Sequence, residues 1–353
     1  MDLGAVTHVV LGGGGLRGFC YLGALTALGD SLQTGGDSLD AFTRRLEVCA
    51  GTSIGCMFAL VLVLGLPVSS LNVLRRSDGA VARDVLPRPS AASLAQGALD
   101  TGASLRLMVA RLLSEASFTD RITLGELRRR TGKRLVCTVC NVLTMRAEYL
   151  DADTAPWMLV VDAVAASMRV PMVYTAHADA EHQMVLTDGG GVDNFPLAAA
   201  ADVPTERVLG MRSWPNTEPV VFDPHAVHGR TYLARALMSP LVALESVQFD
   251  AHPAALQARV VTFGTEGVSG AEFYAGPEVC RALWWTGLWT MYQAIDPARG
   301  AVLNVVVSAL AVHLAARRGA LVERALARTM RQARLPRADE AAPVGITSLE
   351  TLN

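Results

Sequence analysis

A serine flanked by glycines is the first candidate for chemistry in this sequence. Residues 51–55 read Gly-Thr-Ser-Ile-Gly, a G-x-S-x-G pattern with an apolar run on either side. Where a strand turns abruptly into a helix, the residue at the bend is strained and its side chain projects from the sheet edge. We therefore predict that Ser53 is a nucleophile, and that Gly51 and Gly55 leave room for the close crossing. The pattern alone fits an ordinary strand–turn–helix loop equally well.

A glycine-rich loop follows the first predicted strand, residues 8–11. Residues 12–18 read Gly-Gly-Gly-Gly-Leu-Arg-Gly, and a helical pattern begins at Phe19. Consecutive glycines between a strand and a helix let main-chain N–H groups converge on one anionic oxygen. If the loop lies beside Ser53, it forms an oxyanion hole, and Arg17 either holds the loop or neutralises a substrate head group.

The same loop supports a second interpretation. Its spacing of G-x-G-x-x-G at residues 13–18 matches the dinucleotide-binding fingerprint, and Asp37 or Asp40 lies near the distance at which that fold places its ribose-binding acid. The segment 29–40 nevertheless reads as a polar loop, whereas that acid should close a second apolar strand. Dinucleotide binding is therefore the weaker alternative.

An aspartate on a glycine turn is the candidate general base. Residues 184–187 read as a short strand that ends in Asp188, and a run of glycines follows. Most Asp-Gly pairs are solvated turns. As a base, Asp188 would accept the proton of Ser53, and its reference pKa of about 3.9 then requires a desolvated site and a direct hydrogen bond. Gly189 and Gly190 would permit that close approach.

Together these motifs resemble the patatin-like phospholipase family. The shared segments are Gly-Gly-Gly-x-Arg-Gly at 13–18, Gly-Thr-Ser-Ile-Gly at 51–55 and Asp-Gly-Gly at 188–190, in that order. Residues 166–174, Ala-Ser-Met-Arg-Val-Pro-Met-Val-Tyr, are similar to a fourth family segment that precedes the aspartate. The resemblance covers about residues 5–212.

The resemblance implies an α/β fold, with a three-layer α/β/α core and a mostly parallel central sheet. It implies hydrolysis of fatty acyl esters in phospholipids or neutral lipids by a serine–aspartate dyad, without histidine, metal or cofactor. By matching position, Ser53 is the nucleophile and Asp188 the base. The implied oxyanion donors are the amides of Gly13, Gly14 and Gly15, and the supporting positions are Arg17, Gly18, Gly51, Gly55, Gly189 and Gly190. Arg169 stands where the family usually has a small residue. This difference leaves the pocket shape and the head-group preference open, but it does not affect the dyad.

Two other interpretations of the serine remain open. An α/β-hydrolase also uses G-x-S-x-G but takes the proton through a histidine late in the chain. By order, the candidates are His225, His228, His252 and His313. Against this, Ser53 follows only the second recognisable strand, where that fold would place several strands first. A patatin-like scaffold could also serve as a non-catalytic lipid-binding module, although nucleophile, base and glycine loop are all present.

The composition agrees with a soluble enzyme that meets lipid, and it argues against nucleic-acid binding. Of the 353 residues, 51% are hydrophobic, and the formal net charge is −2, so nothing suggests nucleic-acid binding, which calls for a basic surface. Cys137 and Cys140 have C-x-x-C spacing, but in the strand pattern of residues 134–143 an offset of three puts them on opposite faces, against a metal site. No secretory signal is apparent, and we expect a cytoplasmic protein.

The sequence divides into three predicted parts. A patatin-like acyl hydrolase domain covers residues 1–214, a proline-containing linker covers 215–230, and a mainly helical region covers 231–353. Within the first part, residues 103–114 carry an apolar helical face. We expect that helix to pack on the core rather than to cover the site as a flap.

Three segments bear on membrane contact. Residues 56–68 and 301–316 are apolar but too short to span a bilayer, so we expect both to be buried helices. A basic stretch begins at Arg317 and ends at Arg337, with seven arginines and one acidic residue among apolar ones. It fits either contact with an anionic membrane surface, which would make the protein peripheral, or a solvated helical face.

Overall fold

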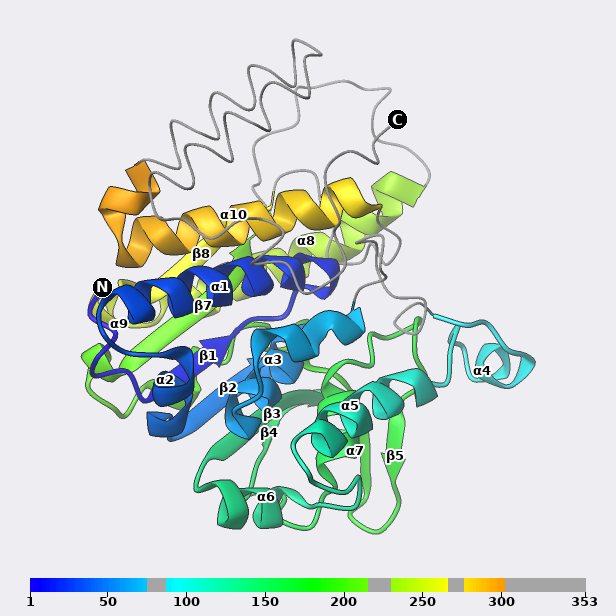
Figure 1. Cartoon of the computed structure of the whole chain (residues 1–353). Helices are drawn as coiled ribbons and strands as arrows, with labels where there is room; N and C mark the ends of the chain where they lie inside the picture. Colours follow the sequence, from blue (N-terminus) through cyan, green and yellow to red (C-terminus); the bar gives the residue numbers. More distant parts are fainter. Residues whose placement is uncertain (75–86, 215–229, 266–275, 302–353) are drawn as a thin grey trace.

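A computed structural model describes residues 1–74, 87–214, 230–265 and 276–301 of the chain (Figure 1). In chain order the strands are β1 (His8–Leu11), β2 (Val48–Thr52), β3 (Arg134–Asn141), β4 (Arg146–Leu150), β5 (His177–Asp179), β6 (Met184–Asp188), β7 (Val208–Trp214) and β8 (Val260–Gly264). The α-helices are α1 (Phe19–Thr34), α2 (Leu39–Arg45), α3 (Ile54–Leu64), α4 (Ala91–Ala95), α5 (Ala103–Glu115), α6 (Leu124–Thr131), α7 (Val160–Ser167), α8 (Arg230–Asp250), α9 (Ala254–Gln257) and α10 (Pro277–Ile295). Short 3-10 helices are η1 (Gly15–Gly18), η2 (Val68–Leu74), η4 (Gly189–Gly191), η5 (Leu197–Ala200) and η6 (Thr205–Arg207).

The sheet is mixed, with a parallel core. Its strands follow the order β5-β6-β3-β2-β1-β7-β8, and β4 pairs with β3 away from this path. Five neighbouring strands of the sheet, β3, β2, β1, β7 and β8, are parallel to one another. The strands β4, β5 and β6 pair in antiparallel fashion. The central strands are buried on both faces, which explains why residues 8–11 lack a polar alternation. The predicted α/β class with a mostly parallel sheet is confirmed.

Helices cover both faces of this sheet. On one face, α1, α3, α5, α7 and α10 build the larger apolar core, and on the other η5, α8 and α9 build a smaller one. Figure 1 shows α1 and α10 side by side although they come from opposite ends of the described chain. A methyl group at Gly23 would lie 1.9 Å from the Trp284 carbonyl oxygen, and one at Gly287 would lie 1.8 Å from that of Cys20. Glycine at both positions is therefore what allows this close helix contact.

The C-terminal half contributes directly to the sheet. β7 lies next to β1, and β8 extends the sheet beyond β7 in parallel. The strand β8 falls in a stretch expected to be mainly helical; its five residues are mostly β-branched or aromatic and gain their backbone partners from β7. The expected linker 215–230, apart from its last residue, lies outside the described residues, as do residues 302–316 and the basic stretch 317–337.

Two helices take the buried places expected of them. α3 is apolar on all sides and lies inside the core. α5 buries the apolar face predicted for it, namely Leu105, Met108, Val109, Leu112 and Leu113. The thiols of the C-x-x-C pair have different neighbours, because Cys137 contacts Cys56 in the core and Cys140 contacts Thr187. Among the described residues, no helix combines the length and the apolar character needed to cross a bilayer.

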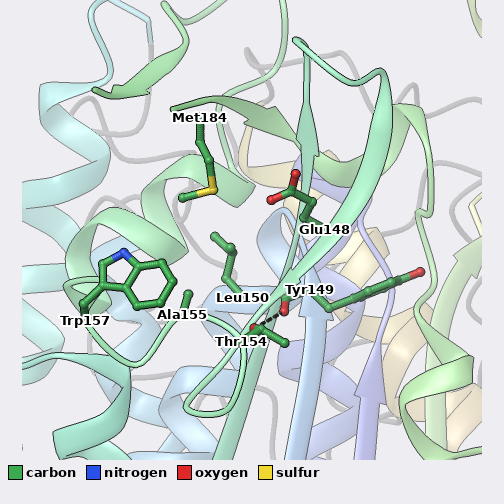
Figure 2. Close-up of a pocket in the computed structure, with 7 residues that line it drawn as sticks. All are labelled: Glu148, Tyr149, Leu150, Thr154, Ala155, Trp157 and Met184. Atoms are coloured by element: carbon green, nitrogen blue, oxygen red, sulfur yellow. Dashed lines mark hydrogen bonds between the residues drawn. The ribbon is translucent and has the colours of Figure 1, made fainter. Parts of the chain in front are cut away.

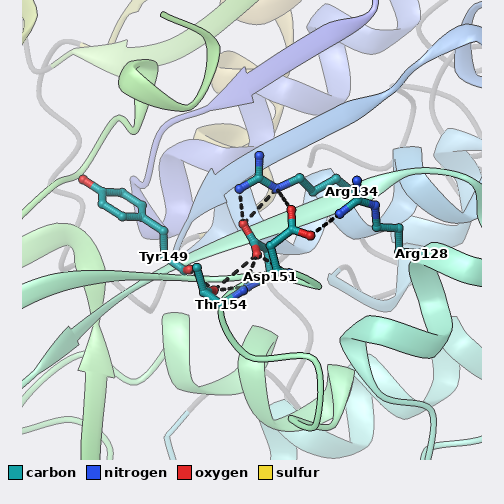
Figure 3. Close-up of polar contacts among 6 residues, drawn as sticks. Arg128, Arg134, Tyr149, Asp151 and Thr154 are labelled. Atoms are coloured by element: carbon teal, nitrogen blue, oxygen red, sulfur yellow. Dashed lines mark hydrogen bonds and ion pairs between the residues drawn. The ribbon is translucent and has the colours of Figure 1, made fainter. Parts of the chain in front are cut away.

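A buried carboxylate ties the turn after β4 to the start of β3 (Figure 3). Asp151 Oδ1 accepts hydrogen bonds from the N–H groups of Asp153 (2.7 Å) and Thr154 (2.9 Å), and Oδ2 accepts one from Arg134 Nε (2.8 Å). Burial by itself raises the pKa of Asp151, but these donors outweigh it and hold the pKa below its ordinary value. The fold therefore stabilises the ionised form.

We predict that Asp151→Asn lowers the free energy of unfolding by roughly 2–3 kcal/mol at pH 7, because the charged hydrogen bonds to Arg134 are lost. A folded-state pKa below the unfolded value of about 3.9 contributes stability above that value, and the contribution is lost as the pH falls through the folded pKa. The difference between wild type and variant, measured by urea unfolding, should stay constant above about pH 5 and shrink below about pH 4.

The matched control is Asp153→Asn, which removes a more exposed partner of Arg128 in the same turn. It should change the free energy of unfolding by less than about 0.5–1 kcal/mol. Equal losses in the Asp151 and Asp153 variants, or a loss that does not change with pH, would contradict the assignment.

Candidate active site

The turn between β2 and α3 holds Ser53 in a strained conformation. Ser53 is the single residue between the two elements, with φ 54° and ψ −128°. Residues with a side chain rarely adopt positive φ, and such strain at a strand–helix bend is typical of a nucleophile elbow. The elements cross closely: a methyl group at Gly51 would lie 2.5 Å from the Cys56 nitrogen, and one at Gly55 would lie 2.4 Å from the Leu11 carbonyl oxygen.

Two buried hydroxyl groups, those of Ser167 and Thr52, hold this turn by hydrogen bonds. Ser53 N–H donates to Ser167 Oγ (2.9 Å), and that hydroxyl donates to the Thr138 carbonyl oxygen on β3 (2.7 Å). Thr52 Oγ1 donates to the carbonyl oxygen of Asp193 (2.9 Å). Ser167 lies in the family segment 166–174, but no motif predicts this role for it. The available signal was a hydroxyl that ends an apolar run, residues 163–166, in this helix.

The strand register brings Asp188 to the same edge of the sheet. On β3, Thr138 lies opposite Thr52 of β2, and the next residue, Val139, lies opposite Asp188 of β6. Because β3 is parallel to β2 and antiparallel to β6, the end of β6 meets the end of β2. Asp188 and Ser53 are therefore neighbours on the same side of β3, the side not taken by β4, although their numbers differ by 135.

Asp188 is held in a buried, sparsely solvated position. Its Oδ1 accepts a hydrogen bond from Gly190 N–H (2.7 Å), and its own N–H donates to the Arg169 carbonyl oxygen (2.9 Å). A methyl group at Gly189 would lie 2.5 Å from the Thr138 carbonyl oxygen, so the turn packs tightly on β3. Burial raises the pKa of Asp188 to about 6, and donors from Ser53 and Gly190 oppose the rise only in part.

The Ser53 hydroxyl and the Asp188 carboxyl face each other at close range. Ser53 lies near enough to lower the pKa of Asp188 as a hydrogen-bond donor, yet the pair does not meet the distance and angle of a full hydrogen bond. Asp188 Oδ2 is buried and has no hydrogen-bond partner among the described residues.

The glycine loop lies against Ser53, but its first amide is already used. A methyl group at Gly13 would come within 3.3 Å of the Ser53 Cβ. Gly13 N–H, one of the three amides expected to be oxyanion donors, donates to the Asn194 carbonyl oxygen (2.8 Å). Within the described part of the chain, the N–H groups of Gly14 and Gly15 have no acceptor. Gly15 has φ 54°, a conformation that favours glycine.

Two arginines near the site are turned into the protein. Arg17 is buried, and its Nε donates weakly to the Gly14 carbonyl oxygen (3.4 Å), which favours holding the loop over contact with a head group. Arg169 is also buried and donates to the carbonyl oxygens of Thr101 and Thr175 (both 2.7 Å). The guanidinium of Arg169 thus joins two loops, and it also donates to Thr175 Oγ1 (3.3 Å).

The alternative sites find little support. Among the described residues, no histidine hydrogen-bonds to Ser53 or Asp188. His225, His228 and His313 lie outside the described residues. His252 lies near enough to Asp193 for its charge to lower the pKa of that carboxyl. The acids considered for ribose binding, Asp37 and Asp40, pair with Arg45 and Arg44 before β2 begins, at the sheet edge opposite the glycine loop. The described residues contain no group of three metal-binding side chains.

A small pocket of about 240 Å³ lies elsewhere on the domain (Figure 2). It is lined by Glu148, Tyr149, Leu150, Thr154, Ala155, Trp157 and Met184. Neither Ser53 nor Asp188 lines it. Figure 2 shows the Tyr149 ring directed away from Trp157 and Met184, and its hydroxyl donates to Asp193 Oδ2 (2.7 Å). This pocket is therefore separate from the predicted catalytic pair.

A family model for patatin-like phospholipase matches residues 9–201, which contain the serine turn, the aspartate and the glycine loop. The chain belongs to this family. By class it is a lipid hydrolase. No curated protein matches the sequence significantly.

Solved structures resemble the fold of this patatin-like protein at low sequence identity. VipD from Legionella pneumophila is 18% identical, with a TM-score of 0.50, over 83% of this chain and 67% of VipD. ExoU of the Pseudomonas aeruginosa type III secretion system, solved with SpcU, is 15% identical, with a TM-score of 0.45, over 93% of this chain and 62% of ExoU. The likeness to VipD supports the patatin-like fold and nothing finer.

We predict that Asp188→Asn abolishes lipid ester hydrolysis while its stability relative to wild type rises with pH. A folded pKa of about 6 lies above the unfolded value, so the folded state loses stability as the pH rises from about 4 to 6, and the amide is spared this loss. The difference in unfolding free energy, variant minus wild type, should increase by roughly 2–3 kcal/mol between about pH 4 and pH 8. Urea unfolding at three pH values measures it, and a flat or falling difference would contradict a buried, near-neutral carboxyl.

Proposed function

We propose that this patatin-like protein is a phospholipase A-type acyl hydrolase in which Ser53 and Asp188 form a catalytic dyad that needs no metal or cofactor. The carrying observation is a strained serine facing a buried carboxylate that has one unpartnered oxygen. Family membership supports a lipid substrate, and the glycine loop beside Ser53 supports acyl transfer. The substrate would be a phospholipid or another acyl-ester lipid.

In the first half of the reaction, Ser53 Oγ attacks the carbonyl carbon of the fatty acyl ester, and its proton passes to Asp188 Oδ2. The carbonyl oxygen becomes an oxyanion, which the N–H groups of Gly14 and Gly15 stabilise together with the positive end of α3. When the tetrahedral intermediate collapses, the ester C–O bond breaks and the leaving alkoxide takes the proton from Asp188. The acyl chain stays on Ser53 as an ester.

The second half repeats these steps with water as the nucleophile. Asp188 accepts a proton from water, the resulting hydroxide attacks the acyl-enzyme carbonyl, and Ser53 leaves with that proton as the fatty acid is released. Both halves require ionised Asp188 at the start. A buried carboxyl with a pKa of about 6 is a stronger base than a solvated one and is still mostly ionised at neutral pH.

The nucleophile is tested by covalent trapping. Incubation of the full chain with a fluorophosphonate should add the probe to Ser53, as found by peptide mass spectrometry, and should stop hydrolysis of a fluorogenic phospholipid. Ser53→Ala should lose the label and at least about 10³-fold in rate, because the serine and its base act as one unit. Chelator should change neither result.

His252→Ala separates the dyad from a histidine triad. It should keep the wild-type rate, since the charge of His252 affects the pKa of Asp193, whereas no histidine among the described residues affects the pKa of Asp188. Loss of turnover on replacing any one histidine, including His225, His228 or His313, would favour the triad. Lipid binding without turnover or labelling in the wild type would favour a non-catalytic lipid-binding module.

We also propose peripheral contact with anionic membranes through the basic stretch that begins at Arg317 and ends at Arg337. Its support comes from the sequence, in which arginines alternate with apolar residues. Each arginine close to an anionic membrane surface contributes roughly 1 kcal/mol to binding, and salt screens this attraction.

Flotation with vesicles tests this proposal. The full chain should float with vesicles that contain phosphatidylglycerol, much less with phosphatidylcholine alone, and less again in high salt. A chain that ends at residue 316 should lose this preference. Equal flotation of the two chains would contradict a membrane role for the stretch.

A further inference from the structure

We infer that Glu245 on α8 is a positioning residue for the glycine loop, acting through Asn194; the inference rests on the hydrolase function proposed above. Glu245 lies outside the segment 9–201 that the family model matches. It comes from a helix that crosses the second face of the sheet, yet its carboxylate is buried beside the loop. No motif of the sequence points to it.

Asn194 is the connection between Glu245 and the loop. Its Nδ2 donates to Glu245 Oε2 (2.7 Å), and its main-chain carbonyl accepts the N–H of Gly13 (2.8 Å). Its Oδ1 occupies the space beside both glycine turns, since a methyl group would lie 2.3 Å from it at Gly13 and 3.0 Å from it at Gly190. Asn194 is thus wedged between the loop and the turn that follows Asp188. A rotated Asn194 side chain would collide with one turn or release the other.

Glu245 also supplies the negative charge between two buried arginines. Its Oε1 lies 3.9 Å from Arg212 Nη1, and Glu245 stabilises the charged form of Arg17, which follows the loop in η1. Burial raises the pKa of Glu245, and Asn194, then the two arginines, oppose that rise. Without this carboxylate, both buried guanidinium groups would lose a charge that stabilises them, and Arg17 lies in η1 next to the amides of Gly14 and Gly15.

Other contacts fix α8 so that Glu245 has one position. Phe249, one turn further along α8, packs on the Arg212 guanidinium, whose carbon lies 3.5 Å from the ring centre, and Trp214 lies near the same group at 4.7 Å. Gln248 Nε2 donates to the Val192 carbonyl oxygen (2.8 Å). Helix position and the charge at 245 can therefore be changed separately.

The expected role of Glu245 is to orient the amides that follow Gly13. While Asn194 holds the Gly13 N–H, the next two N–H groups keep a fixed direction. Preorganised amides matter most in the transition state, so a loosened loop should lower kcat more than it changes KM.

The test compares Glu245→Gln with Asp250→Asn in the full chain. Both substitutions turn a carboxylate into an amide on α8, but Asp250 is exposed and its carboxylate accepts from Ser246, whereas the Asn194 side chain donates to Glu245; both acids stabilise the charge of Arg212. With a fluorogenic phospholipid, Glu245→Gln should lower kcat by about 10- to 100-fold and change KM by less than about threefold. Asp250→Asn should keep both constants.

Hydrogen exchange gives a second readout that does not depend on turnover. Peptides covering residues 12–18 should exchange faster in Glu245→Gln than in wild type, and Asp250→Asn should match wild type. The inference is overturned if Glu245→Gln keeps both wild-type kcat and wild-type exchange, if Asp250→Asn shows the same changes, or if exchange rises throughout the chain as in general unfolding. The proposed function is tested separately: it fails if Ser53→Ala stays active. In that case hydrogen exchange of residues 12–18 in Glu245→Gln still decides whether Glu245 positions the loop.

Discussion

The sharp turn at Ser53 is the constraint on which the rest of the site depends. With a single residue between β2 and α3, the helix must start against the end of the neighbouring strand β1, where Gly55 touches the Leu11 carbonyl. That contact also places the chain leaving β1, the glycine loop, within van der Waals reach of Ser53. A wider turn would relieve the positive φ but separate Ser53 from the loop. The strain is therefore inseparable from the meeting of the two motifs.

Burial of Asp188 follows from the same packing. The acid reaches Ser53 only because β6 runs antiparallel to β3, and this reversed strand delivers its last residue to the edge where the parallel strands also end. In that position the Asp188 carboxyl is buried among few hydrogen-bond donors, and its pKa is therefore raised. Gly189 keeps this turn close to β3 and Gly190 N–H donates to Oδ1, while Oδ2 is buried and has no hydrogen-bond partner among the described residues.

Much of the site could be predicted because its chemistry is local in sequence. Ser53, Asp188 and the loop each sit where an apolar run meets glycines, and β1, β2, β3 and β6 fall within a few residues of those runs. What the sequence could not show is set by distant partners. The Gly13 amide is occupied by Asn194, and the Ser53 amide by Ser167, through contacts that no local pattern encodes. The strand β8 was missed because five residues beside a helix carry too little periodicity.

The C-terminal half changes how the family segment should be regarded. Residues 9–201 contain the motifs, but β1 is covered on its other side by β7, and α1, which continues from the glycine loop through η1, packs along α10. A chain cut after residue 201 would expose one edge of β1 and the apolar face of α1 together. The loop sits at the joint of these two elements, so its geometry cannot be independent of residues beyond the family segment. The catalytic unit of this protein is accordingly longer than the motifs that identify it.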